Sequence, residues 1–234
     1  MERKILGATE TKKIKMTHIQ RLIGRRMLES KQTKPCFYIS SKSDVTDLMA
    51  LRPELRKKLG VKVTTNAFYI HCLALAADEY PLVVGLLAGD RIKIADSVNV
   101  GFAVTAPQGL VVPVLKDADK KTLAQVAVEE KSLTDKTRSN QLTLEDVQGE
   151  TIGLSNLGAY NVDSFIGIVP PPASVIIAVG NVIPTVVVRD GRAVERKIVN
   201  LTLAVDRRVV TEVYAAKFLA RIKDLLQNPQ QVLY

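Results

Sequence analysis

The chain has 234 residues, 47% of them apolar and 24% charged, a composition that excludes a wholly disordered, collagen-like or low-complexity protein. Its net charge of +9 suits nucleic acid, an anionic membrane surface or a phosphate-bearing small molecule, without choosing among them. Cys36 and Cys72 are too few for a disulfide framework and have no metal-ligand spacing. They favour a reducing compartment, the cytoplasm or the mitochondrial matrix, and no apolar stretch approaches the roughly 20 residues of a membrane span.

The first half of the chain reads as an arm followed by alternating helices and strands. Residues 1–15 are polar and lysine-rich, which is typical of an N-terminal arm or the remnant of a linker. Apolar spacing then predicts an amphipathic basic helix, a strand, a helix that stops at Gly60, a buried helix that stops before Pro81, and three short strands. Their expected ranges are Ile19–Met27, Phe37–Val45, Thr46–Leu59, Thr64–Glu79, Arg91–Ala95, Val98–Thr105 and Leu110–Leu115, the last two forming a hairpin around Pro107-Gln108-Gly109.

The second half continues in the same way. A helix is expected over Thr122–Arg138, short apolar strands over Thr151–Asn156 and Ser174–Val179, and a closing helix from about Ala215 to the residues before Pro229. Asp190-Gly191 predicts a tight hairpin between Val186–Arg189 and Ala193–Val205. Because hairpins are frequent among the alternating elements, the pattern predicts an α/β chain with a mixed sheet, an α+β two-layer domain, rather than a doubly wound parallel sheet.

Common catalytic signatures are missing from the sequence. There is no phosphate-binding GxxxxGK[ST] or GxGxxG run, no HExxH, no CxxC and no GxSxG, and no metal is expected. A histidine base would have to be His18, beside the basic helix, or His71, which lies in the most apolar helix and is interpreted as a hydrogen-bonded core residue.

The basic residues also raise the hypothesis that the chain binds nucleic acid. Arg21, Arg25 and Arg26, with Lys12, Lys13 and Lys15 upstream, could contact phosphates or form an ordinary solvated face. Aromatic residues make up only 5% of the chain, with no tryptophan, and no recognition motif accompanies the charges, so no nucleic-acid partner is expected. Nucleic-acid binding would be lost steeply with added salt.

Several runs of residues resemble one family closely. They are Gly149-Glu-Thr-Ile-Gly-Leu-Ser-Asn-Leu-Gly158, Pro170-Pro-Pro-Ala-Ser-Val-Ile-Ile-Ala-Val-Gly180 and the hairpin Val98–Asp119, and shorter matches at Arg25–Lys31, Asp44–Leu48, Asp190-Gly191 and Asn228-Pro229 fall in the same order. The sequence resembles the catalytic core of the dihydrolipoamide acyltransferases of 2-oxoacid dehydrogenase complexes, over residues 16–234.

The resemblance implies a fold like that of chloramphenicol acetyltransferase, with a mixed sheet flanked by helices. It also implies a homotrimer, possibly within a larger cage, that binds other subunits of a 2-oxoacid dehydrogenase complex. The family passes an acyl group between coenzyme A and a lipoyl group carried by another domain, without a metal, in a channel between subunits. Arg21, Arg25 and Arg26 are then candidates for the phosphates of coenzyme A, although the basic helix suits a solvated or inter-subunit face equally well. Asn156 is a further cofactor-binding candidate.

The family's catalytic motifs are only partly present. The serine of its S-N-L-G run, which holds the oxyanion of the tetrahedral intermediate, maps onto Ser155. Its D-H-R-x-x-D-G run reads Asp206-Arg-Arg-Val-Val-Thr-Glu212 here, so Arg207 stands at the histidine, Thr211 at the aspartate and Glu212 at the glycine. An arginine stays protonated and cannot act as a general base.

Two interpretations of this departure stay open. In the first, the chain is an impaired or non-catalytic member that serves as a trimeric scaffold, as component X does in eukaryotic pyruvate dehydrogenase complexes. In the second, it is an active acyltransferase dependent on coenzyme A, in which Ser155 holds the oxyanion and Glu212 or solvent takes the proton.

Overall fold

A computed structural model describes residues 14–106 and 109–233. The expected arm (residues 1–15) and the Pro107-Gln108-Gly109 turn therefore fall largely outside the described residues, as do the side chain of His18 and both Lys12 and Lys13. None of the described helices has the length and apolar content needed to cross a bilayer.

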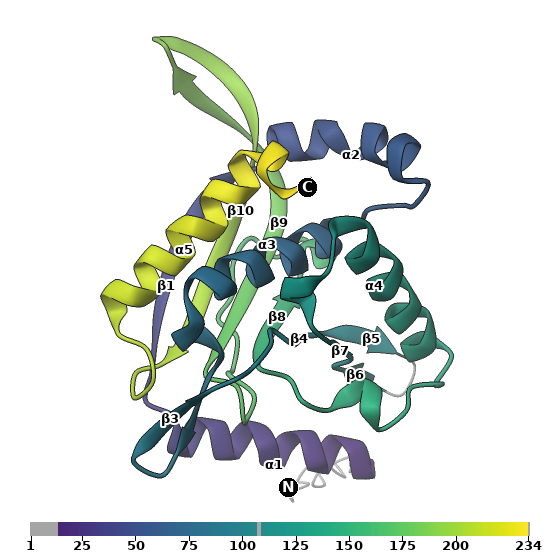
Figure 1. Cartoon of the computed structure of the whole chain (residues 1–234), viewed down its shortest axis with the longest axis vertical. Coiled ribbons are helices and arrows are strands. Elements are labelled where there is room, and N and C mark those ends of the chain that lie inside the picture. Colours follow the sequence, from purple (N-terminus) through teal and green to yellow (C-terminus); the bar gives the residue numbers. More distant parts are fainter. Residues whose placement is uncertain (1–13, 107–108, 234) are drawn as a thin grey trace, which may run out of the picture.

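Helices and strands alternate along the chain, as the sequence predicts (Figure 1). The α-helices are α1 (His18–Thr33), α2 (Thr46–Leu59), α3 (Thr65–Glu79), α4 (Leu123–Arg138) and α5 (Glu212–Gln227). The strands are β1 (Cys36–Asp44), β2 (Gly85–Ala88), β3 (Arg91–Ile94), β4 (Val100–Phe102), β5 (Val104–Ala106), β6 (Gly109–Val111), β7 (Val114–Leu115), β8 (Ile152–Asn156), β9 (Val175–Arg189) and β10 (Arg192–Asp206). Short 3-10 helices are η1 (Pro81–Val84), η2 (Ala118–Lys120), η3 (Glu145–Val147), η4 (Gly158–Tyr160) and η5 (Pro229–Val232).

The main sheet is mixed, which confirms the predicted fold class. Its strand order in the described part of the chain is β1-β10-β9-β8-β4-β7, and β8 runs parallel to both β4 and β9 while the other neighbours are antiparallel. The pairs β2-β3 and β5-β6 form two small sheets of their own.

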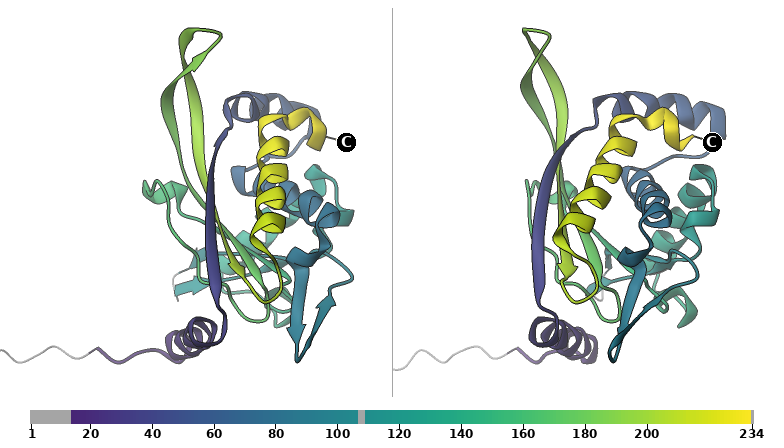
Figure 2. Two further views of the ribbon diagram at one scale, coloured as in Figure 1. Left: turned by 90° about the vertical axis from the view of Figure 1, so that its left-hand side faces the viewer. Right: turned by 60° about the vertical axis from the view of Figure 1, so that its left-hand side comes forward.

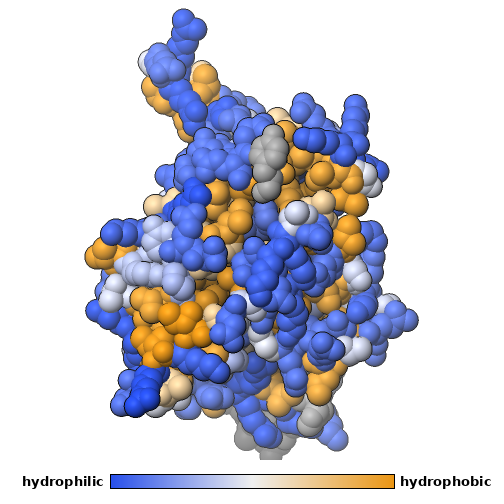
Figure 3. All heavy atoms as spheres, in the orientation of Figure 1, coloured by the Kyte–Doolittle hydropathy of each residue, from blue (hydrophilic) through white to orange (hydrophobic). Residues whose placement is uncertain are grey.

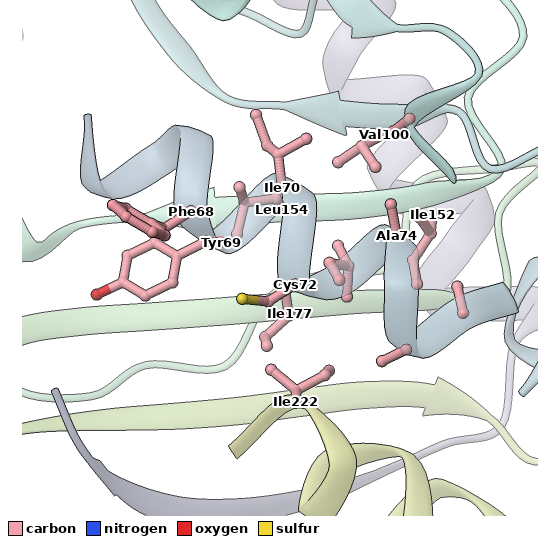
Figure 4. Close-up of a cluster of buried hydrophobic side chains, with 14 of the residues drawn as sticks. Phe68, Tyr69, Ile70, Cys72, Ala74, Val100, Ile152, Leu154, Ile177 and Ile222 are labelled. Atoms are coloured by element: carbon pink, nitrogen blue, oxygen red, sulfur yellow. The ribbon is translucent and has the colours of Figure 1, made fainter. Parts of the chain in front are cut away.

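Helices α3 and α5 cover one face of the main sheet, and α1 lies across its lower end (Figure 2). The core between the helices and the sheet is built on α3, most of whose residues are buried, including Phe68, Ile70 and Leu73. Figure 4 shows Phe68, Ile70 and Cys72 of α3 with Leu154 and Ile177 of the sheet and Ile222 of α5. Alternate residues of each strand point to the opposite face, here called the outer face. The outer face includes Gly153, Ser155, Ile176, Ala178, Thr202 and Ala204.

Four expected strands are wrong in their bounds, one of them Val98–Thr105, which the structure divides into β4 and β5. The expected strands Ser174–Val179 and Val186–Arg189 are one strand, β9, which continues past the end of β8 and becomes an edge. An edge strand has no neighbouring strand on one side, so Pro184, which lacks an N–H, loses no ladder hydrogen bond on the open side. Conversely, the expected strand Leu110–Leu115 is interrupted at Pro113, so that β6 pairs with β5 and β7 with β4.

Beyond the body of the domain, β9 and β10 project together as a long hairpin (Figures 1 and 2). Its direction is fixed where it leaves the body by Asp44, a buried residue at the end of β1. The Asp44 carboxylate accepts hydrogen bonds from Arg189 at 2.9 Å and Arg196 at 2.7 Å. Burial alone would raise the pKa of Asp44, but the hydrogen bonds from Arg196 and Thr46 hold it below its usual value.

Candidate functional site

Ser155 lies near the end of β8 on the outer face. Its neighbours Ile152 and Leu154 belong to the core, and alternation therefore directs Ser155 away from α3. It is half-buried, and its hydroxyl makes no hydrogen bond to the described residues. The hydroxyl is thus available to donate to an oxyanion, as the predicted role requires.

Asn156, a predicted cofactor-binding residue, is occupied within the chain. Its side-chain amide donates to the Asn66 Oδ1 at 2.7 Å, and its Oδ1 accepts from the Gly158 N–H at 2.8 Å. Asn66 lies in the first turn of α3. The amide pair therefore ties the end of β8, next to Ser155, to α3.

Arg207 follows β10 directly and is held at both its backbone and its side chain. Its backbone N–H donates to the Pro35 carbonyl at 3.1 Å, and its Nε donates to the Glu212 Oε1 at 2.7 Å. Thr211 caps α5, its hydroxyl accepting from the Tyr214 N–H at 3.4 Å. The three residues that depart from the family motif thus lie together, and two of them form an ion pair.

Glu212 is a poor candidate for the missing base. A hydrogen bond from its own backbone N–H at the start of α5, and then the hydrogen bond from Arg207, lower its pKa. A carboxylate with a lowered pKa has little tendency to take a proton from a thiol of pKa about 8.5.

Asp206 and Arg208, which match the family motif, form an ion pair beside Arg207, in which Asp206 is buried and Arg208 is exposed. The Asp206 side chain is 1% exposed and accepts from the Arg208 Nε at 2.9 Å and Nη2 at 2.7 Å. Burial by itself would raise the pKa of Asp206, and the bidentate Arg208 holds it below its usual value instead. The segment that carries Arg207 is therefore rigidly placed.

Within one chain, Ser155 and Arg207 are far apart. Ser155 is in register with Ala178, and Ala178 with Thr202, five residues before Arg207 on β10. At about 3.3 Å per residue and about 4.8 Å per strand, the two lie roughly 16 Å apart along the strands and roughly 10 Å across them. A single copy cannot bring both to one reacting atom.

Of the predicted phosphate-binding arginines, two already donate to backbone carbonyls. Arg21 donates to the Met16 carbonyl at 3.0 Å and Arg26 to the Pro171 carbonyl at 2.5 Å. Arg25 is exposed and makes no hydrogen bond or ion pair to the described part of the chain. Arg25 can therefore bind an anion without breaking a contact that holds α1 on the domain.

His71 is a core residue, as interpreted from the sequence, but its Nδ1 is buried without a hydrogen-bond partner. It is 3% exposed within α3, and burial lowers its pKa, against the effect of a hydrogen bond to the backbone of Val232. The described residues contain no cluster of three side chains suited to a metal ion.

Comparison with known proteins decides the family. The model of the catalytic domain of the 2-oxoacid dehydrogenase acyltransferases matches residues 8–234. The chain belongs to this family. The dihydrolipoyllysine-residue acetyltransferase component of the pyruvate dehydrogenase complex from Rickettsia bellii is 35% identical over 92% of this chain and 53% of its own length.

Solved structures of this acyltransferase family share the fold. A dihydrolipoamide acetyltransferase from Azotobacter vinelandii is 30% identical, with a TM-score of 0.90 over 96% of this chain and 95% of that one. The cubic core of a pyruvate dehydrogenase multienzyme complex is 31% identical, with a TM-score of 0.90 over the same shares. Chloramphenicol acetyltransferase, at 14% identity and a TM-score of 0.55 over 86% of this chain and 94% of that one, confirms the predicted fold.

The Azotobacter structure concerns the catalytic roles of a serine, a histidine and an asparagine spaced 52 and 4 residues apart. Ser155, Arg207 and Thr211 have the same spacing in this acyltransferase-family chain. The chain spans about half the length of the curated relatives it matches, since it covers 53% and 56% of the first two.

Sequence reasoning missed one titratable group on the outer face, Glu150. This carboxyl is buried against Gly101 and Gly153. Gly153, a glycine inside a predicted strand, was the available signal, because such a glycine often marks a close approach by another group.

Proposed function

We propose that this chain is the core domain of a dihydrolipoamide acyltransferase component whose histidine-dependent acyl transfer is impaired or lost, and that it serves as a trimeric scaffold. The observation that carries the proposal is the ion pair between Arg207 and Glu212 at the positions of the family's histidine and glycine. Arg207 cannot accept a proton, and the lowered pKa of Glu212 disfavours it as a substitute. Loss of a positioned base costs about 10²- to 10⁴-fold in rate.

The separation of Ser155 and Arg207 supports assembly of several copies, and the family resemblance points to a trimer. Because one chain keeps them apart, a site that uses both positions needs two copies. The projecting hairpin supports association, since Val186 and Val188 are 70% and 76% exposed on it and an isolated two-stranded hairpin is marginal in water. Apolar surface is visible on this hairpin in Figure 3. We infer that the trimers form a larger cage and that they bind other subunits of a 2-oxoacid dehydrogenase complex.

The chemistry left to this chain is oxyanion stabilisation and alignment of two thiol-bearing arms, with the lipoyl arm supplied by another domain. The Ser155 hydroxyl, which makes no hydrogen bond to the described residues, supports the first task. Arg25 on α1 supports binding of coenzyme A, because it has no other partner among the described residues. Arg21 and Arg26 would first have to break their hydrogen bonds to backbone carbonyls.

The alternative is an active acyltransferase that depends on Ser155 and on solvent as the proton acceptor. A few per cent of a free thiol is already thiolate near pH 7, which is the chemical argument in its favour. Acyl transfer by the unmodified chain that is abolished by Ser155→Ala would support it.

The deciding experiment measures acyl transfer from acetyl-CoA to dihydrolipoamide by the unmodified chain and by the triple variant Arg207→His, Thr211→Asp, Glu212→Gly. The matched control is the double variant Thr211→Asp, Glu212→Gly, which lacks only the imidazole. We expect turnover in the triple variant alone, with all three proteins trimeric by light scattering. Equal rates in the unmodified chain and the triple variant would overturn the proposal.

A further inference from the structure

Glu150, the residue two positions before β8, has its carboxyl group in a space made by two glycines. Gly101 of β4 and Gly153 of β8 are paired in register. A Cβ atom on Gly101 would lie 2.5 Å from the Glu150 Cδ, and one on Gly153 would lie 3.1 Å from its Oε1. The carboxyl therefore occupies the volume that two side chains of the outer face would otherwise fill.

This carboxyl is not satisfied where it lies. Glu150 is 8% exposed, and its Oε1 is buried without a hydrogen-bond partner. A buried carboxylate without donors is unfavourable, so the neutral acid is preferred. Burial raises the pKa of Glu150 to about 7, and the positive charges of Arg26 and Lys34 oppose that rise.

The two cations that favour ionised Glu150 already have another task, which is to seat α1. Side chains of α1 and of the turn after it donate three hydrogen bonds to backbone carbonyls of the segment Val169–Ala173. Arg26 donates to the Pro171 carbonyl at 2.5 Å, Ser30 to the Val169 carbonyl at 2.6 Å, and Lys34 to the Ala173 carbonyl. Two of the three donors, Arg26 and Lys34, are thus the same cations that lower the pKa of Glu150.

Among the described residues, Arg26 and Lys34 are the charged groups that act on Glu150. The paired strands β4 and β8 place Gly101 and Gly153 at the carboxyl. Burial lowers the pKa of Lys34. The charge of Asp206 and, more weakly, those of Cys36 and Glu29 raise this pKa, while that of Arg208 lowers it. An ionised Glu150 would therefore draw on the cations at α1.

We propose that Glu150 is a proton-binding site that controls how α1 is seated on the domain. With the carboxyl neutral, Arg26 and Lys34 donate to the Pro171 and Ala173 carbonyls and α1 is held down. When the proton leaves to solvent, the buried carboxylate attracts one of these side chains, a backbone carbonyl loses its donor, and α1 loosens. This inference does not depend on acyl transfer.

The test is hydrogen–deuterium exchange of α1 peptides at pH 6 and pH 8, corrected for the intrinsic pH dependence of exchange. Between these values the ionised fraction of a group with a pKa of about 7 rises about tenfold. We expect protection of α1 to fall by about that factor in the unmodified chain and by less than about twofold in Glu150→Gln, which keeps the shape but cannot ionise.

Glu130→Gln is the matched control, because Glu130 is also a buried carboxyl but is hydrogen-bonded to Thr64 at 3.0 Å, away from α1. It should leave the response of α1 unchanged. Should Glu150→Gln fold poorly, Arg26→Gln retains a donor for the Pro171 carbonyl without the charge and is expected to weaken the response. An α1 whose protection is independent of pH in the unmodified chain, or a full response in Glu150→Gln, would overturn the proposal.

Discussion

Glu150→Gln should change the pH dependence of the stability of the whole domain, apart from its effect on α1. The folded-state pKa of Glu150 is raised from 4.5 to about 7. A carboxyl whose pKa is raised by folding contributes its full stabilisation below the pKa of the unfolded state. That contribution is lost as the pH rises through the pKa of the folded state. The unmodified chain should therefore lose stability relative to the variant between pH 4.5 and pH 7.

The size of the effect follows from the shift. A rise of the pKa from 4.5 to about 7, at about 1.4 kcal/mol per pKa unit, gives about 3 kcal/mol, most of which is lost between pH 5 and pH 8. Glu150 is almost fully buried, so solvent screening reduces this little.

Urea unfolding at pH 5 and pH 8, at one protein concentration, measures the effect. With a denaturant slope of about 2 to 3 kcal/mol/M, the midpoint of the variant should gain about 1 M on the unmodified chain as the pH rises. Other titrating groups, such as His71, are common to both proteins and cancel in the difference. A difference in stability that stays constant from pH 5 to pH 8 would refute the reasoning.

Three further substitutions test the framework that carries the site. Gly180→Ala would place a Cβ 2.0 Å from the backbone oxygen of Asp163, and should cost about 1 to 3 kcal/mol or more in urea unfolding. Asp44→Asn removes the charge that fixes Arg189 and Arg196, and should make the Asp190-Gly191 hairpin more sensitive to limited proteolysis, with a loss of about 1 to 3 kcal/mol. Phe68→Ala should cost about 3 to 5 kcal/mol in thermal or urea unfolding, because Phe68 is fully buried in the core.

The sequence predicted α2, α3 and α4 closely because their signals are local, but α1 extends to Thr33, six residues beyond its expected end at Met27. Apolar spacing and Gly60 marked α2 to its last residue, and the apolar run up to Glu79 marked α3. Strand bounds depend on neighbours that lie far along the chain, so β9 could not be joined across Gly180 and Pro184 without knowing that β8 ends beside Val179. The hairpin β2-β3 was half missed for the same reason, since exposed Arg91–Ile94 shows a pattern but Gly85–Ala88 does not.

The sequence names candidate site residues but does not give their arrangement. Family motifs pointed to Ser155 and Arg207, yet nothing in the sequence places them on strands whose register keeps them apart. The pairing of Arg207 with Glu212 was equally hidden, because it depends on the turn that leads into α5. Burial of Glu150 required the fold, since its effect comes from glycines on two strands.

Arg207→His alone should not restore a good general base, because Glu212 would remain beside it. Arg207 now donates to the Glu212 carboxylate at 2.7 Å, and an introduced imidazole would meet the same negative charge. A neighbouring carboxylate favours the protonated form and raises the pKa of an imidazole above its usual value of about 6.5. At pH 7 more of the imidazole would then be protonated and unable to accept a thiol proton.

NMR titration of the introduced imidazole measures this directly. Its pKa should be higher in Arg207→His than in the double variant Arg207→His, Glu212→Gly, and acyl transfer should follow the fraction of neutral imidazole. Arg207→His, Thr211→Asp is the matched control, since it adds a carboxylate at Thr211 but keeps Glu212. An imidazole pKa that is the same with Glu212 and with glycine would show that the ion pair does not govern this position, and that the substitution at Arg207 alone explains any loss of activity.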